Sequence, residues 1–180
     1  MIRRRSRAVT LPALKDDPVA IEAAWRIHQA QMDWTARVDA KAAFAFAIES
    51  AAIATTLGLT SSGRLTGFDH WWLTTLYMVG LAFLLLSAGF AALVVTPRLR
   101  RSKTKIEFPN NLVYFGHLRH WQPTELELAL KHEPMLPQLS RQIVSMARIS
   151  WTKHVRVQFS FTFAIVGSVC LAACVLLRAM

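Results

Sequence analysis

Three long apolar runs dominate the sequence. The first, residues 42–59, holds one charged side chain, Glu49, whereas the second, 71–96, and the third, 157–177, hold none. A helix of about 20 mostly apolar residues crosses the hydrocarbon core of a bilayer, so the second and third runs predict transmembrane helices. The first run is also predicted to span, because the second needs a partner crossing and the polar segment 58–67 is typical of a short turn.

Polar segments lead into the first and third runs without a helix-breaking residue. Asp17 followed by Pro18 is a typical helix start, with an acid as N-cap and proline at the first helical position. No further proline or glycine occurs before Gly58, so we expect one helix from Pro18 through the first span. In the same way, Pro137 can begin a helix that continues without a breaker to Gly167 in the third span.

Each of these two long helices carries a heptad-like stripe, with residues recurring at alternating spacings of four and three. In the first helix the stripe consists of Ile21, Trp25, His28, Met32, Thr35 and Asp39. In the second helix it consists of Leu139, Ile143, Met146, Ser150, Lys153 and Val157. The residues of each stripe share one face of their helix.

The segment between the second and third spans predicts short elements. Residues 103–108 could be extended, and a short helix is expected over 109–121. Thr124 and Glu127 have the spacing of a capping box, which predicts a further helix that ends near His132.

The placement of lysine and arginine predicts the topology. The 180 residues carry a net charge of +10, and nineteen of the twenty-one Lys and Arg lie within residues 1–41 or 97–156. The positive-inside rule places both segments in the cytoplasm, with the C-terminus on the opposite side. The basic charge is therefore a topology signal, and no nucleic acid polymer is expected as a partner.

These features predict an all-α integral membrane protein with three transmembrane helices, two of them continuous with long cytoplasmic helices, and a small helical cytoplasmic module. The expected order is a disordered basic tail at 1–17, a cytoplasmic helix at 18–41, spans at 42–59 and 71–96, the cytoplasmic module at 97–156, and the third span at 157–177.

Enzyme signatures are absent from the sequence. It has no Gly-rich phosphate loop, no G-x-S-x-G and no H-E-x-x-H, so we do not expect an enzyme. His117 and His120 lack a further ligand at metal-site spacing, and neither a metal nor a cofactor is expected. Cys170 and Cys174, one turn apart in the third span, are interpreted as small packing residues.

The stretch PNNLVYFGHLRHW could hold a nucleotide. Asn110 or Asn111 at a helix N-terminus would leave backbone N–H groups free to attract an anion. Tyr114, Phe115 and Trp121 offer flat surfaces on which a base could stack. The alternative is that the nearby basic residues bind lipid headgroups and the aromatic residues form the core of a small domain.

Glu49 is the one acid within the spans. It lies eight residues beyond Lys41, about 12 Å into the bilayer. A lipid-facing carboxylate is very unfavourable, so we expect Glu49 to face a helix interface or an oligomer axis, protonated or hydrogen-bonded, with Ser87 or Ser168 as partner. It would either line a conducting path or join helices.

The order of several segments is similar to a known family. VDAKAA at the entry to a span, a second span that closes on Pro97, IEFPNNLVYFGHL, and QIVSMARISWTKHVRVQFSF entering a third span together resemble the membrane effectors of the bacterial Pycsar antiphage systems. The likeness covers roughly residues 20–175. Its family-like charged residues are Asp39, Lys41 and Lys153, for which a structural ion-pair cluster at the headgroup level is the alternative.

The resemblance implies a function. A partner cyclase would make a cyclic pyrimidine mononucleotide, cUMP or cCMP, on phage infection. The effector, a multi-pass protein of the bacterial inner (plasma) membrane, would sense it in the cytoplasm, impair the membrane and cause abortive infection. We expect a homo-oligomer, because three short helices cannot enclose a pore alone. The alternatives are a membrane scaffold, or a small channel or transporter subunit without a nucleotide ligand.

The expected ligand site combines two segments. The nucleotide would dock between the 110–117 helix and the helix that carries Arg148 and Lys153. The candidate ligand-binding residues are Asn110, Asn111, Tyr114, Phe115, Arg148 and Lys153, and the candidate coupling residues are Asp39, Lys41 and Glu49.

Overall fold

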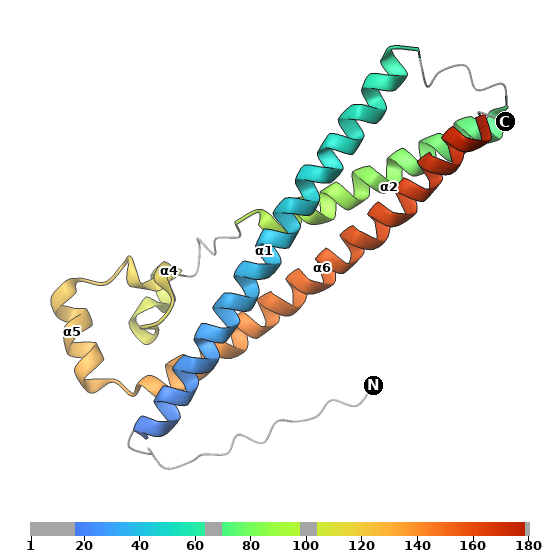
Figure 1. Ribbon diagram of the computed structural model, residues 1–180. Helices are drawn as coiled ribbons and strands as arrows, with labels where there is room; N and C mark the ends of the chain where they lie inside the picture. Colours follow the sequence, from blue (N-terminus) through green and yellow to red (C-terminus); the bar gives the residue numbers. More distant parts are fainter. Residues whose placement is uncertain (1–16, 64–69, 98–103, 179–180) are drawn as a thin grey trace, which may run out of the picture. The chain divides into compact units, whose positions relative to one another are not determined.

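The protein is built from helices. The computed structural model describes residues 17–63, 70–97 and 104–178, and this part of the chain contains no strand. In chain order its elements are α1 (Pro18–Ser61), α2 (Trp71–Val95), α3 (Thr104–Glu107), the 3-10 helix η1 (Phe108–Asn110), α4 (Phe115–Leu118), α5 (Pro123–His132) and α6 (Met135–Arg178) (Figure 1). The all-α prediction is confirmed. The predicted basic tail lies outside the described residues, except for Asp17.

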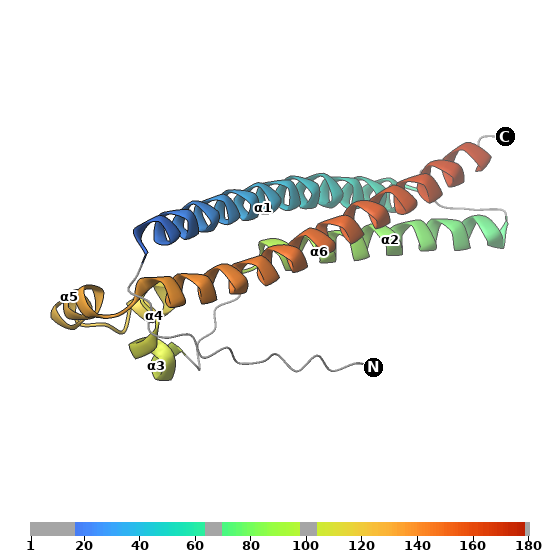
Figure 2. The same cartoon turned by 90° about the horizontal axis from the view of Figure 1, so that it is seen from below.

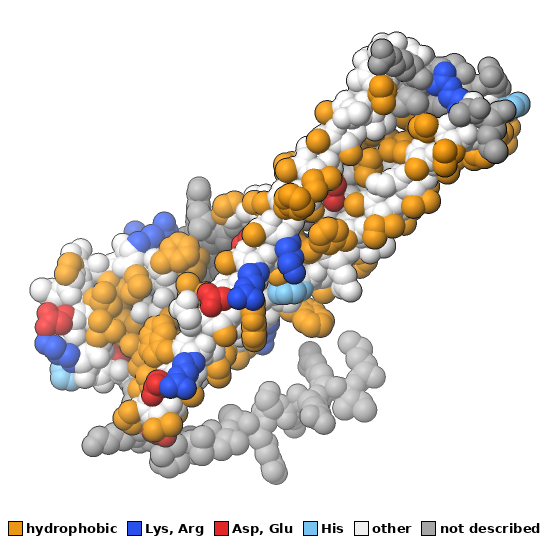
Figure 3. Space-filling model, in the orientation of Figure 1, with side chains coloured by type: hydrophobic (Ala, Val, Ile, Leu, Met, Phe, Trp, Pro, Cys, Tyr) orange, Lys and Arg blue, Asp and Glu red, His pale blue; other side chains and the backbone are white. Residues whose placement is uncertain are grey.

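In the described part of the chain, three helices are long and apolar enough to cross a membrane, as predicted. α2 has 25 residues, close to the length that a bilayer requires, whereas α1 and α6 each have 44. The extra length of α1 and α6 carries the polar sequence that precedes each apolar run. Figure 3 shows the consequence for α1, whose first half bears charged side chains and whose second half is covered by hydrophobic ones. Both long helices are therefore single, unbroken elements.

The start of α1 agrees with its sequence signal. The Asp17 carboxylate oxygen Oδ1 accepts a hydrogen bond of 3.0 Å from the backbone N–H of Val19, and the Asp17 carbonyl accepts one from Ile21. An N-cap acid satisfies an N–H group that has no partner inside the helix. Pro18 at the first helical position needs no such partner, since it has no N–H.

The inward face of α1 differs from the predicted stripe at two of its six positions, Trp25 and Met32. Trp25 and Met32 are 42% and 45% exposed, whereas their neighbours Ala24 and Gln31 are buried. The buried residues of α1 recur as Ala24, Gln31, Val38, Ala42, Ala45 and Glu49. The alternating spacing of four and three is therefore found on the buried face, whereas the predicted stripe itself is half-buried at four positions and exposed at Trp25 and Met32. Three of the six buried residues are alanines, whose small side chains let helix backbones approach closely.

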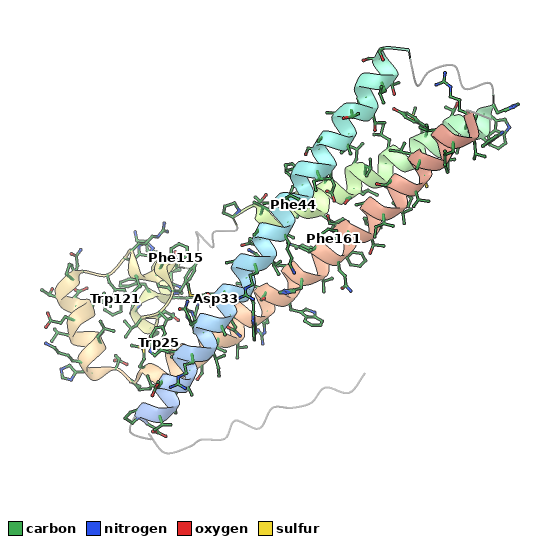
Figure 4. The ribbon with its side chains drawn as sticks, viewed as in Figure 1. Trp25, Asp33, Phe44, Phe115, Trp121 and Phe161 are labelled. Atoms are coloured by element: carbon green, nitrogen blue, oxygen red, sulfur yellow. The ribbon has the colours of Figure 1, made fainter. Side chains whose placement is uncertain are left out.

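The stripe predicted for α6 is confirmed. Leu139, Ser150 and Val157 are buried, and Ile143, Met146 and Lys153 are half-buried. The same spacing continues beyond the prediction to Ser160, Gly167 and Cys174, all of them buried. Large side chains such as Phe161 of α6 and Phe44 of α1 lie outside the buried faces of their helices and are exposed (Figure 4). In a bilayer those outward faces would meet lipid.

The chain divides into two compact units, each described by itself. We call residues 30–63, 70–97 and 146–178 the three-helix unit, and residues 17–29 and 104–145 the short-helix unit. In the three-helix unit α2 runs alongside the C-terminal half of α6 in both views (Figures 1 and 2). The two backbones meet at glycines: a Cβ atom added to Gly167 would lie 2.9 Å from the Gly80 carbonyl oxygen and 3.0 Å from the Leu84 nitrogen.

Both ends of the three-helix unit have apolar cores. Val38 and Ala42 of α1 cluster with Val94 of α2 and Val157 of α6 at one end. At the other end Leu73, Tyr77 and Cys174 cluster, and the Tyr77 hydroxyl lies 2.6 Å from Thr60 Oγ1. Cys174 is a free thiol within this core, in agreement with its predicted packing role.

The short-helix unit departs from prediction at three places. Residues 104–107 are helical rather than extended, and the buried Thr104 at the start of this helix contacts the side chains of Arg119 and His120 through its hydroxyl. The helix expected over 109–121 is interrupted, since Asn111 is extended with φ −142° and ψ 108°. α5 begins at Pro123, which places Thr124 inside the helix instead of at its cap. The predicted capping box is therefore wrong.

Candidate functional site

The first candidate site is an ion pair between α1 and α6 in the three-helix unit. Lys153 Nζ of α6 donates to both carboxylate oxygens of Asp39 of α1, at 2.6 and 2.7 Å. The two side chains are 22% and 38% exposed, so water still reaches the pair. Lys41, the third family-like residue, is exposed. The Asp39–Lys153 contact corresponds to the structural ion pair that was the alternative to a ligand-binding role for Lys153.

The second candidate site lies where all three long helices meet. Glu49 of α1 is 4% exposed, and its Oε1 atom lies 2.5 Å from Ser87 Oγ of α2 and 3.1 Å from Ser160 Oγ of α6. Ser87 Oγ also lies 2.6 Å from the Ser160 carbonyl oxygen. We call these three residues the Glu49 cluster. Glu49 thus faces a helix interface within one chain, and its contact with Ser87 is as predicted.

The alternative prediction, that Ser168 is the partner of Glu49, is wrong. Ser168 is exposed, one position outside the buried seam of α6, and Ser160 takes the predicted place beside Glu49. Ser168 was expected because it would lie at a similar depth in the bilayer to Glu49. The contact instead depends on which residues lie on the buried face of α6. Ser160 could have been found by extending the four-and-three spacing of that seam beyond Val157. Whether Glu49 also lines a conducting path stays a prediction.

The candidate ligand residues of the short-helix unit lie on an irregular segment. The backbone N–H of Asn111 donates to the Phe108 carbonyl, and the N–H of Leu112 donates to Gln138 Oε1 at 2.7 Å. The predicted anion site required these amides to be free at a helix N-terminus, so that part of the hypothesis is wrong. The cause is tertiary, because Gln138 of α6 supplies the acceptor that interrupts the helix.

The polar groups of Asn110 and Asn111 tie this segment together. The Asn111 side-chain amide donates to the Glu107 carbonyl at 2.7 Å, and the Asn110 carbonyl accepts a hydrogen bond of 3.1 Å from Arg141. Sequence reasoning missed Gln138 and Arg141, which lie one turn apart at the start of α6. The spacing of three residues, which places both side chains on one helix face, was the sequence feature that could have indicated them.

Aromatic side chains surround the next turn. The rings of Tyr114 and Phe115 are 4.6 Å apart, and Tyr114 packs edge-on against His117 at 5.3 Å. Gly116 makes this arrangement possible, since a Cβ atom there would lie 2.3 Å from the Tyr114 ring. Phe115 remains 65% exposed and, like Trp121, is labelled in Figure 4. Trp121 is half-buried, donates its indole N–H to the Phe108 carbonyl and packs edge-on against the Phe108 ring.

The six predicted ligand residues are divided between the units. Asn110, Asn111, Tyr114 and Phe115 belong to the short-helix unit, and Arg148 and Lys153 belong to the three-helix unit. Arg148 is exposed on α6. Their joint role in one site stays a prediction. Among the described residues no three potential metal ligands cluster together.

Comparison with known proteins gives one match. The family model for the Pycsar effector protein domain matches residues 23–179, which include all of the long apolar helices except the first turn or two of α1. No curated protein and no solved structure matches the chain.

Proposed function

Because the chain belongs to the Pycsar effector family, a family of antiphage membrane effectors, we propose that it is activated by a cyclic pyrimidine mononucleotide, cUMP or cCMP. Binding in the cytoplasm changes the packing of the spanning helices. The membrane then loses integrity, and the infected cell stops before phage is released. The protein performs this task without catalysis of its own.

The observation that carries the proposal is the continuity of α6. One uninterrupted helix, Met135–Arg178, holds the residues that contact the 108–121 segment and the residues that contact α1 and α2. Near its start, Gln138 and Arg141 bind the backbone of that segment. Farther along, Lys153 and Ser160 contact α1 and α2. A ligand that alters the first set of contacts can therefore act on the second along one continuous helix.

The ligand needs a cation for its phosphodiester and a flat surface for its base. Within the short-helix unit, the exposed Phe115 ring with Tyr114 beside it supports base stacking, and Asn111 can read a base edge. Arg141 joins the predicted set, because its guanidinium already binds Asn110 at the edge of this segment. Arg148 and Lys153 remain proposed contacts, and displacement of Lys153 from Asp39 would couple binding to α1.

Calorimetric titration of the purified full-length protein with cUMP and cCMP tests this function. We expect binding of one of the two, and its loss in Asn111→Ala and in Arg148→Ala with membrane insertion unchanged. Lys131→Ala on α5 removes an exposed cation that pairs with Glu127 and serves as the matched control. Vesicles that leak with no nucleotide present would instead favour a channel subunit without a nucleotide ligand.

The orientation and assembly are part of the same proposal. The N-terminus and residues 125–135 lie in the cytoplasm, the C-terminus lies across the inner membrane, and several copies assemble. Reporter fusions at Met180 and within 125–135 should report opposite sides, and the same side for both would contradict three crossings. Mass measurement of the purified protein in detergent gives the number of copies.

A further inference from the structure

α1 and α6 run in the same direction through the three-helix unit. Their contacts advance together along both helices, from the Asp39–Lys153 pair to the contact between Glu49 and Ser160. In such a parallel pair, the residues one position before the buried face of one helix lie on the same side as the residues one position after it on the other. The pair therefore has two different sides, each lined by residues of both helices.

α2 packs against one of these sides. Arg156, one position before the buried Val157 of α6, donates to the Leu93 carbonyl of α2 at 3.3 Å. Phe159, one position before the buried Ser160, packs its ring against Phe90 of α2 at 5.7 Å. The opposite side is lined by the residues just before the buried face of α1 and just after that of α6.

This opposite side, which we call the outer face, has the same order of side chains on both helices. It consists of Trp34, Arg37, Lys41, Phe44 and Ile48 of α1 and of Trp151, His154, Gln158, Phe161 and Ile165 of α6, all of them exposed. On each helix a tryptophan comes first, charged or polar residues follow, and large apolar residues continue into the span. Figure 3 shows Lys, Arg and His side chains on α1 and α6 directly beside the hydrophobic surface, and Figure 4 labels Phe44 and Phe161 at neighbouring levels.

The outer face carries positive charge without a balancing acid. Residues 33–41 of α1 and 148–156 of α6 hold five Lys and Arg but two Asp, and one of these, Asp39, pairs with Lys153. Neither Arg37 nor Lys41 forms an ion pair with any described acid. Two cations one helical turn apart, at the start of an apolar run, are suited to an anion from outside the chain.

An anionic phospholipid matches the outer face along its whole length. Its phosphate lies at the headgroup level, where Arg37 and Lys41 follow the interfacial tryptophan, and its acyl chains extend toward the bilayer centre, as Phe44 and Ile48 do. A soluble anion such as a mononucleotide or inorganic phosphate would match the two cations alone. It would leave the apolar part of the same face uncovered.

A second copy of the chain matches this face poorly. Copies related by an axis along the membrane normal present the same residues to each other at the same depth. The outer face would then bring Arg37 and Lys41 against Arg37 and Lys41 of the other copy, and like charges repel.

We propose that the outer face is a binding site for an anionic phospholipid, with the phosphate on Arg37 and Lys41 and the acyl chains along Phe44, Ile48 and Phe161. The bound lipid fixes the depth of α1 and α6 in the bilayer and supplies the exposed Lys41 with an anionic partner. The site goes beyond the proposed function and does not rest on it, because it requires membrane insertion but no nucleotide.

Thermal unfolding of the purified full-length protein in detergent, with lipid added, tests the site. Phosphatidylglycerol, which carries a negative charge, should raise the thermal midpoint of the wild type more than zwitterionic phosphatidylcholine does, because a ligand of the folded state stabilises it. The double variant Arg37→Gln with Lys41→Gln should lose this difference, since its affinity for phosphatidylglycerol falls by about fivefold for each cation removed. Arg26→Gln with Lys131→Gln removes the same charge from exposed positions elsewhere and should keep the difference.

Labelling shows where the lipid lies. Phosphatidylglycerol with a photoreactive group in its acyl chain should label the peptides that contain Phe44 or Phe161 in the wild type and in the control, but not in Arg37→Gln with Lys41→Gln. Equal stabilisation by the two lipids, or unchanged stabilisation and labelling in the double variant, overturns the proposal.

Two further measurements separate the lipid from other occupants. Glycerol phosphate, the soluble headgroup, should leave the thermal midpoint unchanged, and a rise equal to that with phosphatidylglycerol would assign the site to a soluble anion instead. The mass of the protein in detergent should be the same in the wild type and the double variant, and dissociation of the variant would assign the face to contact between copies. All of these experiments omit cUMP and cCMP, so a failure of nucleotide binding with normal lipid binding would count against the proposed function alone.

Discussion

α1 and α6 are joined by two polar contacts that use the same kind of side chain in opposite ways. At the Asp39 level, a carboxylate pairs with a full positive charge, and both side chains remain partly exposed. At the Glu49 level, ten residues and about 15 Å farther along α1, the carboxyl group is buried among hydroxyl and carbonyl oxygens. One contact is ionic and the other is a network of hydrogen bonds.

The difference follows from the medium around each contact. Charges at the edge of the apolar region keep much of their hydration, so pairing them costs little and contributes little. In the apolar region a carboxyl group loses that hydration, so the hydrogen bonds that it forms with neighbouring side chains and backbone become its main source of stabilisation. The two contacts should therefore respond differently to substitution and to salt.

The largest effect is expected where α6 approaches α2, because the Glu49 cluster depends on that approach. Gly167→Leu would place a side chain against the Gly80 carbonyl and the Leu84 nitrogen. We expect a loss of about 3 kcal/mol or more in the free energy of unfolding in mixed detergent micelles, because overpacking forces the backbones apart. Gly89→Leu on α2 has open space at its Cβ and is the matched control. Equal losses in both variants would show that glycine replacement itself, and not the close approach, is responsible.

Ser87→Ala tests the buried contact directly. It leaves the Ser160 carbonyl and Glu49 Oε1 without their shared hydroxyl, so we expect a loss of about 2 kcal/mol, typical of buried groups left unsatisfied. The loss should be the same at low and at high salt, since no charge is exposed to screening. A loss that shrinks as salt is added would mean that the cluster is ionic.

Lys153→Met tests the exposed contact, since methionine keeps the apolar stem and removes the charge. We expect a loss of about 1 kcal/mol or less at low salt, and a smaller one at about 1 M salt, because the pair is partly hydrated. The exchanged pair Asp39→Lys with Lys153→Asp should recover stability relative to either single reversal. No recovery would indicate that each residue acts separately, for example on a ligand.

Ser160→Ala should have the smallest effect. The variant loses the hydroxyl at 3.1 Å from Glu49 but keeps the carbonyl oxygen that Ser87 contacts at 2.6 Å. We expect a loss of about 0.5 kcal/mol in the same unfolding measurement, only slightly larger than that of Ser168→Ala, an exposed surface position. A loss as large as that of Ser87→Ala would assign the main contact to the side chain of Ser160 instead of its backbone.

Much of this protein is determined by local sequence. The apolar runs, the Asp17–Pro18 start and the absence of breakers predict α1, α2 and α6 to within a few residues, because each signal acts over one helical turn or one bilayer thickness. The α6 stripe also follows from spacing alone. The heptad spacing of α1 could also be predicted from the sequence, since it depends on the residues of one helix alone.

Only the tertiary structure decided which residues meet. Lys153 pairs with Asp39, which is 114 positions away in the sequence. Glu49 contacts Ser160 and not Ser168, because Ser160 lies on the buried face of α6 and Ser168 does not. The burial of Ala24 and Gln31 in place of Trp25 and Met32 was likewise not evident from the sequence. In the short-helix unit, Gln138 interrupts the expected helix by binding Leu112 from 26 residues away. Short helices have little stability of their own, so such distant contacts determine where they begin and end.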